Sequence, residues 1–452
     1  MTAQPSQAEH ASQAKDVTYV RVAAIALPVV VSNATVPLQS AIDTAIIGNL
    51  GSEIYLAAVT LGGAVMALVL QVFNFLQFGA GALGAQALGA RDHRRVINVL
   101  ARALILAVGI AVLLILAQGP LARQAMRIFE ASAEAEDLAA LYFSIRIWAA
   151  PAELANFALM GWFSGQELTR RLFEMQLVVS VSNIVLNLIF VLGLGMDVDG
   201  VALGTLIAAY IGLGFGLWRA RARMAWLMPD WRPERKRLLN RAELIGLMRL
   251  NRDIFIRTMI LVGSFTWMTR LGSLQGDVIL AANGILFQIF HLASYALDGF
   301  AIAVESLVGQ AVGAKDRRFL RRAVVVSTIC AFVVSGLLAA LLLAIHVPLI
   351  TLFTNVADVR TETLAYFFWA ALFPVIGVLA FQMDGIFVGA AAGPAMRNAM
   401  IVSGGIYLAI STWSLEVWGN HGVWGAIWAF LILRGVTLLV QYPALERRIA
   451  DT

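Results

Sequence analysis

The stretch "LPVVVSNATVPLQSAIDTAIIG", residues 27–48, is apolar enough to cross a membrane, yet it carries one carboxylate, Asp43. A helix needs about 20 apolar residues to span a bilayer, whereas a transmembrane barrel strand is about 10 residues long and alternates in polarity. Other long uncharged stretches, such as Ala103 to Ala122, are also of helical length. The sequence therefore predicts an all-α integral membrane protein.

The composition agrees with a membrane-spanning chain. Of its 452 residues, 60% are hydrophobic and 13% are charged, which leaves too little polar surface for a soluble globule of this size. Residues 1–18 are polar and lack the basic-then-apolar pattern of a cleavable signal, so we expect a disordered cytoplasmic tail. The single cysteine, Cys330, excludes an intrachain disulfide and a cysteine metal cluster.

We expect twelve membrane-spanning segments. They are 19–48, 54–82, 96–118, 138–162, 170–194, 200–219, 246–270, 278–308, 322–346, 362–390, 396–416 and 422–443. The loops after the even-numbered segments hold three, two, eight, five and one basic residues in turn, whereas the opposite loops hold only Arg123, Arg127, Arg270 and Arg360. Because cytoplasmic loops collect Lys and Arg, both termini are expected in the cytoplasm. This orientation explains the basic loops without nucleic acid, although a lipid- or partner-binding role for them remains an alternative.

The chain also repeats itself. "GAQALGARDHRR" (84–95) recurs as "VGQAVGAKDRRF" (308–319), and "GWFSG" (161–165) recurs as "GIFVG" (385–389), both at an offset of 224 residues. Each repeat holds six spans, so the two lobes begin on the same side of the membrane. Two pseudo-symmetric six-helix lobes around a central cleft are typical of alternating-access transporters.

This arrangement divides the chain into five parts. They are a cytoplasmic tail (1–18), an N-terminal lobe (19–219), a cytoplasmic connector (220–245), a C-terminal lobe (246–443) and a C-terminal tail (444–452).

Asp43 is the foremost candidate for ion coupling. An ionisable side chain inside a span costs about 2.5–3.5 kcal/mol or more at the bilayer centre, and by default it faces an interior cavity. Pro28 and Pro37 each remove a backbone hydrogen bond from the first span and can bend it. Because an apolar environment penalises a charged carboxylate, such an acid can couple proton uptake to helix shape. The second repeat has Ser264 at the equivalent position, so the fold itself needs no acid there. The alternative is that Asp43 only sits at the wet interface.

Three polar residues are expected to contact this carboxylate. Asn183 and Asn187 lie four residues apart, on one face of the fifth span, and Thr205 lies one turn into the sixth. Two amides and a hydroxyl could hydrogen-bond Asp43, or they could join helices within the lobe.

The second lobe carries further candidates for the cleft. His291, Asp298 and Glu305 are spaced by seven residues and share one helix face, where they could relay protons or attract a cation. The alternative is pairing with basic residues of neighbouring spans, which we favour for Glu305. Asp384 stands where its repeat equivalent is the uncharged Met160.

Asn33 and Asn156 complete the set of cleft candidates. Glu153 and Arg146, seven residues apart, are expected to neutralise one another.

The sequence lacks the motifs of nucleotide and metal chemistry. There is no GxxxxGK[ST] phosphate-binding loop, and the five histidines show no metal-binding spacing. We therefore expect no ATP hydrolysis, no enzymatic activity, no metal and no cofactor, and an ion gradient as the source of energy.

The order of these blocks resembles the multidrug and toxic compound extrusion (MATE) family, and within it the bacterial DinF-like branch. The resemblance runs from about Ala23 to Pro443. The blocks that carry it, besides the first span, are "GAQALGARD", "APAELANFALMGWFSG", "NIVLNLIFVLGL", "YALDGFAIAVESLVGQAVGAKD" and "DGIFVGA".

The resemblance implies export of small amphipathic, often cationic compounds across the inner membrane in exchange for H⁺ or Na⁺. It also implies that the acid at Asp43 is the coupling carboxylate, in contact with Asn183, Asn187 and Thr205. At Asn187, however, the family usually has aspartate. An amide neither titrates nor adds charge to a cation site, so this chain is expected to favour H⁺ over Na⁺.

We therefore expect a proton-coupled antiporter, acting as a monomer among membrane lipids, with an amphipathic small molecule as substrate and no nucleic-acid partner. A Na⁺-coupled exporter is one alternative. A lipid-intermediate flippase is another, but it should line its cleft with cations for a pyrophosphate, whereas Arg146, Arg257 and Arg434 look scattered. A membrane enzyme would require converging catalytic motifs, and none is visible.

Overall fold

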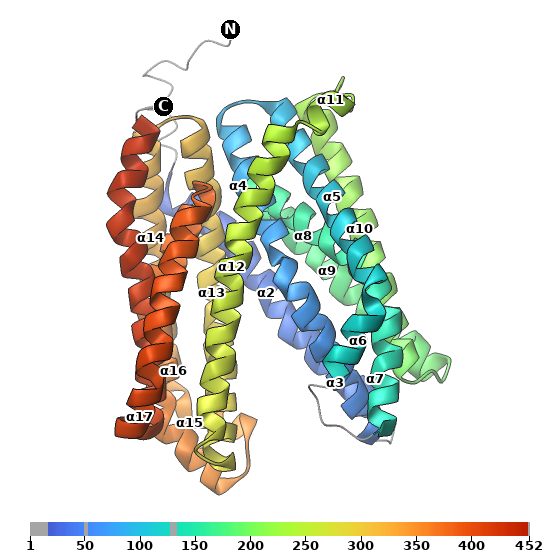
Figure 1. Ribbon diagram of the computed structural model, residues 1–452, viewed down its shortest axis with the longest axis vertical. Coiled ribbons are helices and arrows are strands. Elements are labelled where there is room, and N and C mark those ends of the chain that lie inside the picture. The colour runs from blue at the N-terminus through green and yellow to red at the C-terminus, as the bar shows by residue number, and fades with distance from the viewer. Residues whose placement is uncertain (1–16, 49–52, 127–132, 451–452) are drawn as a thin grey trace. The chain divides into compact units, whose positions relative to one another are not determined.

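The computed structural model describes residues 17–48, 53–126 and 133–450. The expected N-terminal tail (1–18) therefore lies almost wholly outside the described residues, as does Arg127 of the loop count. Throughout the described ranges the chain is built from helices joined by short turns (Figure 1).

The helices of the first half are long, and several consist of two pieces. They are α2 (Tyr19–Gly48), α3 (Glu53–Gln71), η1 (Val72–Asn74), α4 (Phe75–Gly89), α5 (His93–Leu116), α6 (Gln118–Met126), α7 (Ala133–Arg146), η2 (Ile147–Ala149), α8 (Ala150–Gly165), α9 (Thr169–Asn187), η3 (Leu188–Gly193), α10 (Val198–Leu227) and α11 (Arg235–Leu238). The short η elements continue the helices that precede them, so α3–η1–α4, α7–η2–α8 and α9–η3 each form one helical run.

The second half follows the same plan. Its helices are α12 (Arg241–Ser273), α13 (Asp277–Gly313), α14 (Arg317–Ala344), α15 (His346–Phe353), α16 (Ala357–Gly389) and α17 (Gly393–Ala450). Inside α17, Gly419 has φ +56° and ψ −137°, a backbone conformation that favours glycine and divides α17 into two spans.

Eight helical runs in the described residues are long and apolar enough to cross a membrane, and α17 is among them. Because α17 is broken at Gly419, it counts as two spans, and α2, α7–α8 and α12 complete the twelve that the sequence predicts. The all-α membrane fold is thus confirmed.

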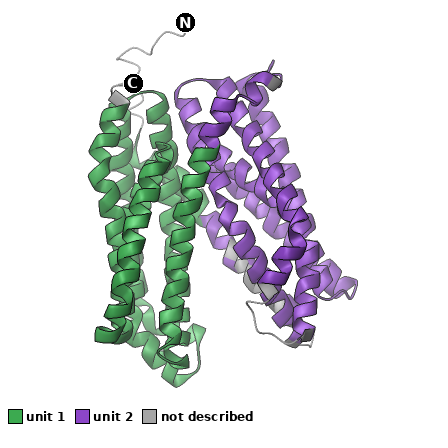
Figure 2. Ribbon diagram, viewed as in Figure 1, with its two compact units in different colours: residues 1–30, 248–452 green, residues 31–247 purple. Residues whose placement is uncertain are grey.

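Contacts divide the chain into two compact units (Figure 2). Unit 2 comprises residues 31–247, and unit 1 comprises residues 1–30 together with 248–452. The boundary falls inside α2, two residues after Pro28, so the first turns of α2 group with the later part of the chain. The sequence had placed the whole first span in the N-terminal lobe.

The predicted connector and C-terminal tail are largely helical. Within the connector (220–245), α10 continues to Leu227, α11 follows, and α12 begins at Arg241. Within unit 2, the buried Arg102 ties α11 to α5, because its guanidinium donates to the carbonyl oxygens of Leu238 (3.1 Å) and Arg237 (2.7 Å). Residues 444–450 of the expected tail extend α17.

Each unit has its own core. In unit 2, α4 packs against α5 and α8, and α9 packs against α10. Trp162 is fully buried there among Ile97, Leu100 and Leu159, and its indole Nε1 donates to the carbonyl oxygen of Val96 at 2.8 Å.

In unit 1, α13 and α16 pack closely, and α16 packs against α17. A polar link inside this unit joins α13 to α17, because Asn283 and Asn420 exchange two amide hydrogen bonds of 2.8 and 2.9 Å.

The internal repeat appears as duplicated backbone geometry within the two units. Left-handed residues occur in pairs 224 positions apart, and these pairs are Arg91 and Lys315, Glu167 and Ala391, and Gly195 and Gly419. Asp92 and Asp316 both cap a helix N-terminus by accepting from the backbone N–H three residues later, at 2.9 Å. The two halves therefore share turns and caps as well as sequence.

The repeated glycines make the same helix contact twice. In unit 2, a Cβ on Gly161 or Gly165 of α8 would overlap the carbonyl oxygen of Gln77 or Gly81 in α4. In unit 1, a Cβ on Gly385 or Gly389 of α16 would overlap the carbonyl oxygen of Ala301 or Glu305 in α13, again 224 positions on. Backbones approach this closely only where side chains are absent. We call these two contacts the glycine seams.

Candidate functional site

Asp43 lies at one end of a hydrogen-bonded chain of polar side chains in unit 2. Asn187 Nδ2 donates to Asp43 Oδ1 at 2.8 Å and lies 3.3 Å from Asn183 Oδ1. Asn183 Nδ2 donates to Thr205 Oγ1 at 2.9 Å. Asn183 and Asn187 are fully buried, and Asp43 is partly buried. The structure therefore brings together all four residues singled out in the sequence, from α2, α9 and α10.

Local sequence explains how this polar chain forms. The spacing of four residues puts both asparagines on one face of α9. Gly204 lets α10 approach them, because a Cβ there would overlap Asn187 Oδ1. Thr205 Oγ1 also donates to the carbonyl oxygen of Val201 at 2.9 Å, which fixes its lone pairs toward Asn183. Directly after Asn187, α9 continues as the π-helix η3, a geometry often found at functional sites.

The charges near Asp43 come from α7 and α8. Arg146 acts electrostatically on Asp43. Its guanidinium Nη1 also lies 2.6 Å from Glu153 Oε1, which confirms the predicted pairing of these two residues. Because Glu153 offsets the charge of Arg146, the buried amides supply the direct contact to the carboxylate.

The other candidates of the first lobe lie outside the hydrogen-bonded chain that ends at Asp43. α2 is helical through both Pro28 and Pro37, and Pro37 is exposed. Asn156 Nδ2 donates to the carbonyl oxygen of Ala209 at 3.1 Å and so links α8 to α10. Asn33 lies partly buried in α2.

In unit 1, Asp384 lies between two arginines. Arg257 of α12 and Arg434 of α17 each form an ion pair with Asp384 Oδ2, and all three residues are at least nine-tenths buried. The view that the in-span cations are scattered is therefore wrong for Arg257 and Arg434, which are 177 positions apart in sequence yet meet at one carboxylate. Asp298 of α13 acts electrostatically on both guanidinium groups. Two acids thus balance two bases.

His291, Asp298 and Glu305 share one face of α13, but each lies in a different environment. The His291 ring packs against Phe287 and Phe290, with centroids 4.7 and 5.9 Å away. Asp298 faces the arginines. Glu305 is 4% exposed and forms no ion pair with any described residue, so the pairing favoured for it is wrong. Within the described ranges, no three His, Cys, Asp or Glu side chains gather as a metal site.

Comparison with known proteins decides the family. The MatE family model matches residues 28–189 and 254–412, one match in each half of the chain. The chain belongs to the MatE family. Family members are membrane transporters and not enzymes.

Comparison of this MatE protein with individual relatives supports the same family. It is 35% identical to the DNA damage-inducible protein F of Escherichia coli, and the match covers 92% of this chain and 90% of that one. It is 24% identical to the probable multidrug resistance protein NorM of Chromobacterium violaceum, covering 95% and 94%. A solved structure described as the outward-facing conformation of a multidrug resistance MATE family transporter superposes with a TM-score of 0.84 at 20% identity, covering 99% of both chains. That likeness supports the fold.

Three residues of the polar site in this MatE protein, Gln39, Ser180 and Gly204, were not foreseen in the sequence. Gln39 Oε1 accepts from Ser180 Oγ at 2.9 Å, which adds a second link between α2 and α9. Gln39 lies four residues before Asp43, so the same helical spacing that singled out the asparagines could have found it. Gly204 gives no such signal, because its contribution is the absence of a side chain.

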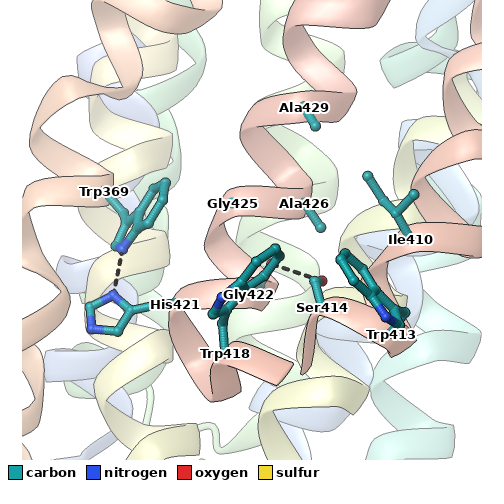
Figure 3. A pocket seen from close by; sticks show the side chains of 10 residues that line it. All are labelled: Trp369, Ile410, Trp413, Ser414, Trp418, His421, Gly422, Gly425, Ala426 and Ala429. Atoms are coloured by element: carbon teal, nitrogen blue, oxygen red, sulfur yellow. Dashed lines mark hydrogen bonds between the residues drawn. The ribbon is translucent and has the colours of Figure 1, made fainter. Parts of the chain in front are cut away.

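The MatE chain also holds an apolar cavity of about 470 Å³ in unit 1, between α16 and the two spans of α17 (Figure 3). Trp369, Trp413 and Trp418 line it, and Trp369 Nε1 donates to His421 Nδ1 at 3.0 Å. The sequence did not indicate this cavity, which forms where Gly419 turns the chain.

Proposed function

We propose that this MatE transporter exports small amphipathic or cationic compounds across the inner membrane in exchange for protons, by alternating access, with Asp43 as the coupling carboxylate. The observation that carries the proposal is the 2.8 Å hydrogen bond from Asn187 to Asp43 within a buried amide network. The names of relatives support the substrate class, since one is a probable multidrug resistance protein. The basic loops support an orientation with both termini in the cytoplasm.

The amide of Asn187 suits both protonation states of Asp43. A charged carboxylate only accepts hydrogen bonds, and Asn187 Nδ2 donates one. A protonated carboxyl group must also donate. Asn187 Oδ1 is buried and has no hydrogen-bond partner among the described residues, so rotating the amide would offer it to the new O–H. An aspartate at position 187 would instead repel a charged Asp43.

Proton uptake would change how α2 is held. The charged Asp43 attracts the Asn187 amide protons and Arg146, and protonation removes both attractions. α2 also carries two prolines, each of which removes a backbone hydrogen bond, so α2 bends at less cost than an uninterrupted helix. We propose that bending at Pro28 and Pro37 follows the release of Asp43.

The same network favours H⁺ over Na⁺. Hard cations prefer several oxygen ligands with negative charge, and this network offers one carboxylate with neutral amide and hydroxyl oxygens. A proton needs only the carboxylate.

The test is efflux from proteoliposomes driven by an imposed pH gradient. We expect Asp43→Asn to insert and fold but to lose pH-driven efflux, while Asp137→Asn, an acid-to-amide change at an exposed position of α7, transports as wild type. Efflux by Asp43→Asn at the wild-type rate would refute the coupling role. A sodium gradient at fixed pH is the second arm, and transport driven by it would overturn the assignment to protons.

The flippase alternative gains no support from the meeting of Arg257 and Arg434. Both guanidinium groups are already paired with Asp384, so a pyrophosphate would have to displace a buried carboxylate to reach them. These contacts fit an antiporter better, since the cluster of Arg257, Arg434, Asp384 and Asp298 in unit 1 carries no excess positive charge.

A further inference from the structure

Four arginines gather at one end of unit 2, where α8 turns into α9 and α10 ends. Arg170 and Arg171 lie in the first turn of α9, and Arg219 and Arg223 lie in the last turns of α10. Arg171 acts electrostatically on both Arg219 and Arg223, so like charges are held near one another. We call these four residues the arginine cluster.

Nearby acids do not balance the arginine cluster. Glu174 accepts from Arg219 and lies 3.3 Å from Arg170 Nε, so one carboxylate serves two guanidinium groups. Arg223 Nε donates to the neutral amide oxygen of Gln166 at 3.0 Å. Even with Glu167 of the adjoining turn counted, four bases face two acids.

Some donors of the arginine cluster are buried and unused. Arg171 Nη1 and Arg219 Nε have no hydrogen-bond partner within the part of the chain that the structure describes. Buried polar groups are almost always hydrogen-bonded, so these donors point to an acceptor that binds there. Excess positive charge requires that acceptor to be an anion.

Exposed tryptophans flank the arginine cluster. Trp218 is 61% exposed and Trp226 is 70% exposed. The guanidinium carbon of Arg219 lies 5.5 Å from the ring centroid of Trp218, and that of Arg223 lies 4.2 Å from Trp226. Tryptophan collects at the membrane–water boundary, where its ring lies at headgroup depth. The arginine cluster therefore lies where the apolar α10 leaves the bilayer.

We propose that the arginine cluster binds the phosphate headgroup of an anionic phospholipid, with Trp218 and Trp226 against the lipid's glycerol and upper acyl chains. Charge complementarity selects an anion, and the exposed indoles select one that carries an apolar body. By the positive-inside rule this end faces the cytoplasm, so the lipid belongs to the cytoplasmic leaflet. The proposal is independent of ion coupling at Asp43.

The test is native mass spectrometry of the purified transporter, which counts retained lipids after incubation with phosphatidylglycerol or phosphatidylcholine. The wild type should retain phosphatidylglycerol preferentially. In Arg171→Gln/Arg223→Gln that retention should fall about tenfold or more, since each basic residue near an anionic surface strengthens binding roughly fivefold. The control, Arg232→Gln/Arg241→Gln, removes two exposed connector charges that stack on no aromatic ring among the described residues, and it should retain phosphatidylglycerol as the wild type does.

Several outcomes would overturn the proposal. If the wild type retains both lipids equally, the proposal is overturned. This result needs no variant, so the test still holds if a variant fails to fold. Equal losses in the test and control variants would mean a diffuse charge effect. Displacement of phosphatidylglycerol by millimolar inorganic phosphate would indicate a soluble anion site. Arg171→Lys/Arg223→Lys keeps the charge and should keep the lipid preference.

Discussion

Gly204→Ala should damage the polar site without touching any polar atom. A Cβ at this position would come closer to Asn187 Oδ1 than the 3.0 Å that real Cβ atoms keep, and it would also lie 3.2 Å from Asn187 Cγ. The α10 backbone is held by its own helix, so the Asn187 amide must move. That movement breaks the 2.8 Å bond to Asp43 and the contact with Asn183.

The expected loss of stability follows from the polar groups that lose their hydrogen-bond partners. A buried polar group that loses its partner costs about 1–3 kcal/mol, and Asn187 with Asp43 supplies two such groups. Replacing glycine by alanine inside a helix stabilises the helix by about 1 kcal/mol, which offsets part of this loss. We therefore expect Gly204→Ala to lower stability by about 1–5 kcal/mol, and the unfolding midpoint should fall by roughly 2–4 °C per kcal/mol for a domain of about 150–250 residues, the size range of unit 2.

The assay is the fraction of folded protein recovered by size-exclusion chromatography after heating in detergent. Gly214→Ala is the matched control on the same helix, since a Cβ there meets nothing within 4 Å, and it should be neutral or stabilising. In an Asn187→Ala background the clash disappears, so Gly204→Ala should no longer destabilise. If Gly204→Ala lowers the stability of the wild type and of Asn187→Ala by the same amount, the clash with Asn187 is not the cause.

Three further predictions use the same assay. Asp384→Asn takes the ion-pair partner from two buried guanidinium groups and should cost about 3–5 kcal/mol. Glu234→Gln, whose carboxylate is 46% exposed and whose partners Arg94 and Arg237 are 36% and 59% exposed, should cost only about 0–1 kcal/mol; equal losses would contradict the burial argument. Gly165→Ala and Gly389→Ala each meet a backbone carbonyl and should yield no folded protein, while Gly63→Ala and Gly336→Ala meet open space and should fold; a stable Gly165→Ala would disprove the seam. Trp162→Phe removes the indole hydrogen bond to the carbonyl oxygen of Val96, which keeps its intrahelical bond within α5, and should cost about 0.5–1.5 kcal/mol; no shift in the midpoint would show that this hydrogen bond contributes nothing to stability.

The sequence predicts the spans well because hydropathy reports what lipid requires. It predicts helix ends less well, since hydropathy says nothing about where a helix stops in water. α10 continues beyond the predicted boundary at residue 219 to Leu227, through a segment rich in arginine and alanine, which are good helix formers. α17 likewise runs to Ala450.

The polar site could be predicted because its residues are locally conspicuous. Asn183 and Asn187 share a helix face inside lipid, and Asp43 is the acid that stands in the first span. The Arg257–Asp384–Arg434 cluster could not be predicted, because three separate helices must pack before the charges meet. Gly204 could not be predicted either, since spacing and charge do not distinguish one glycine in a span from another.

The glycine seams restrict which movements the transporter can make. If α8 slid along α4 by one residue, or rotated by one position, side chains would replace Gly161 and Gly165 against the carbonyl oxygens of Gln77 and Gly81. The same holds for α16 against α13 in unit 1. Each helix pair therefore has a single permitted register and must travel through the whole transport cycle as one rigid block. A disulfide that joins α8 to α4, or α16 to α13, at positions other than the seam glycines should leave transport intact, whereas locking α2 to a neighbouring helix should stop it.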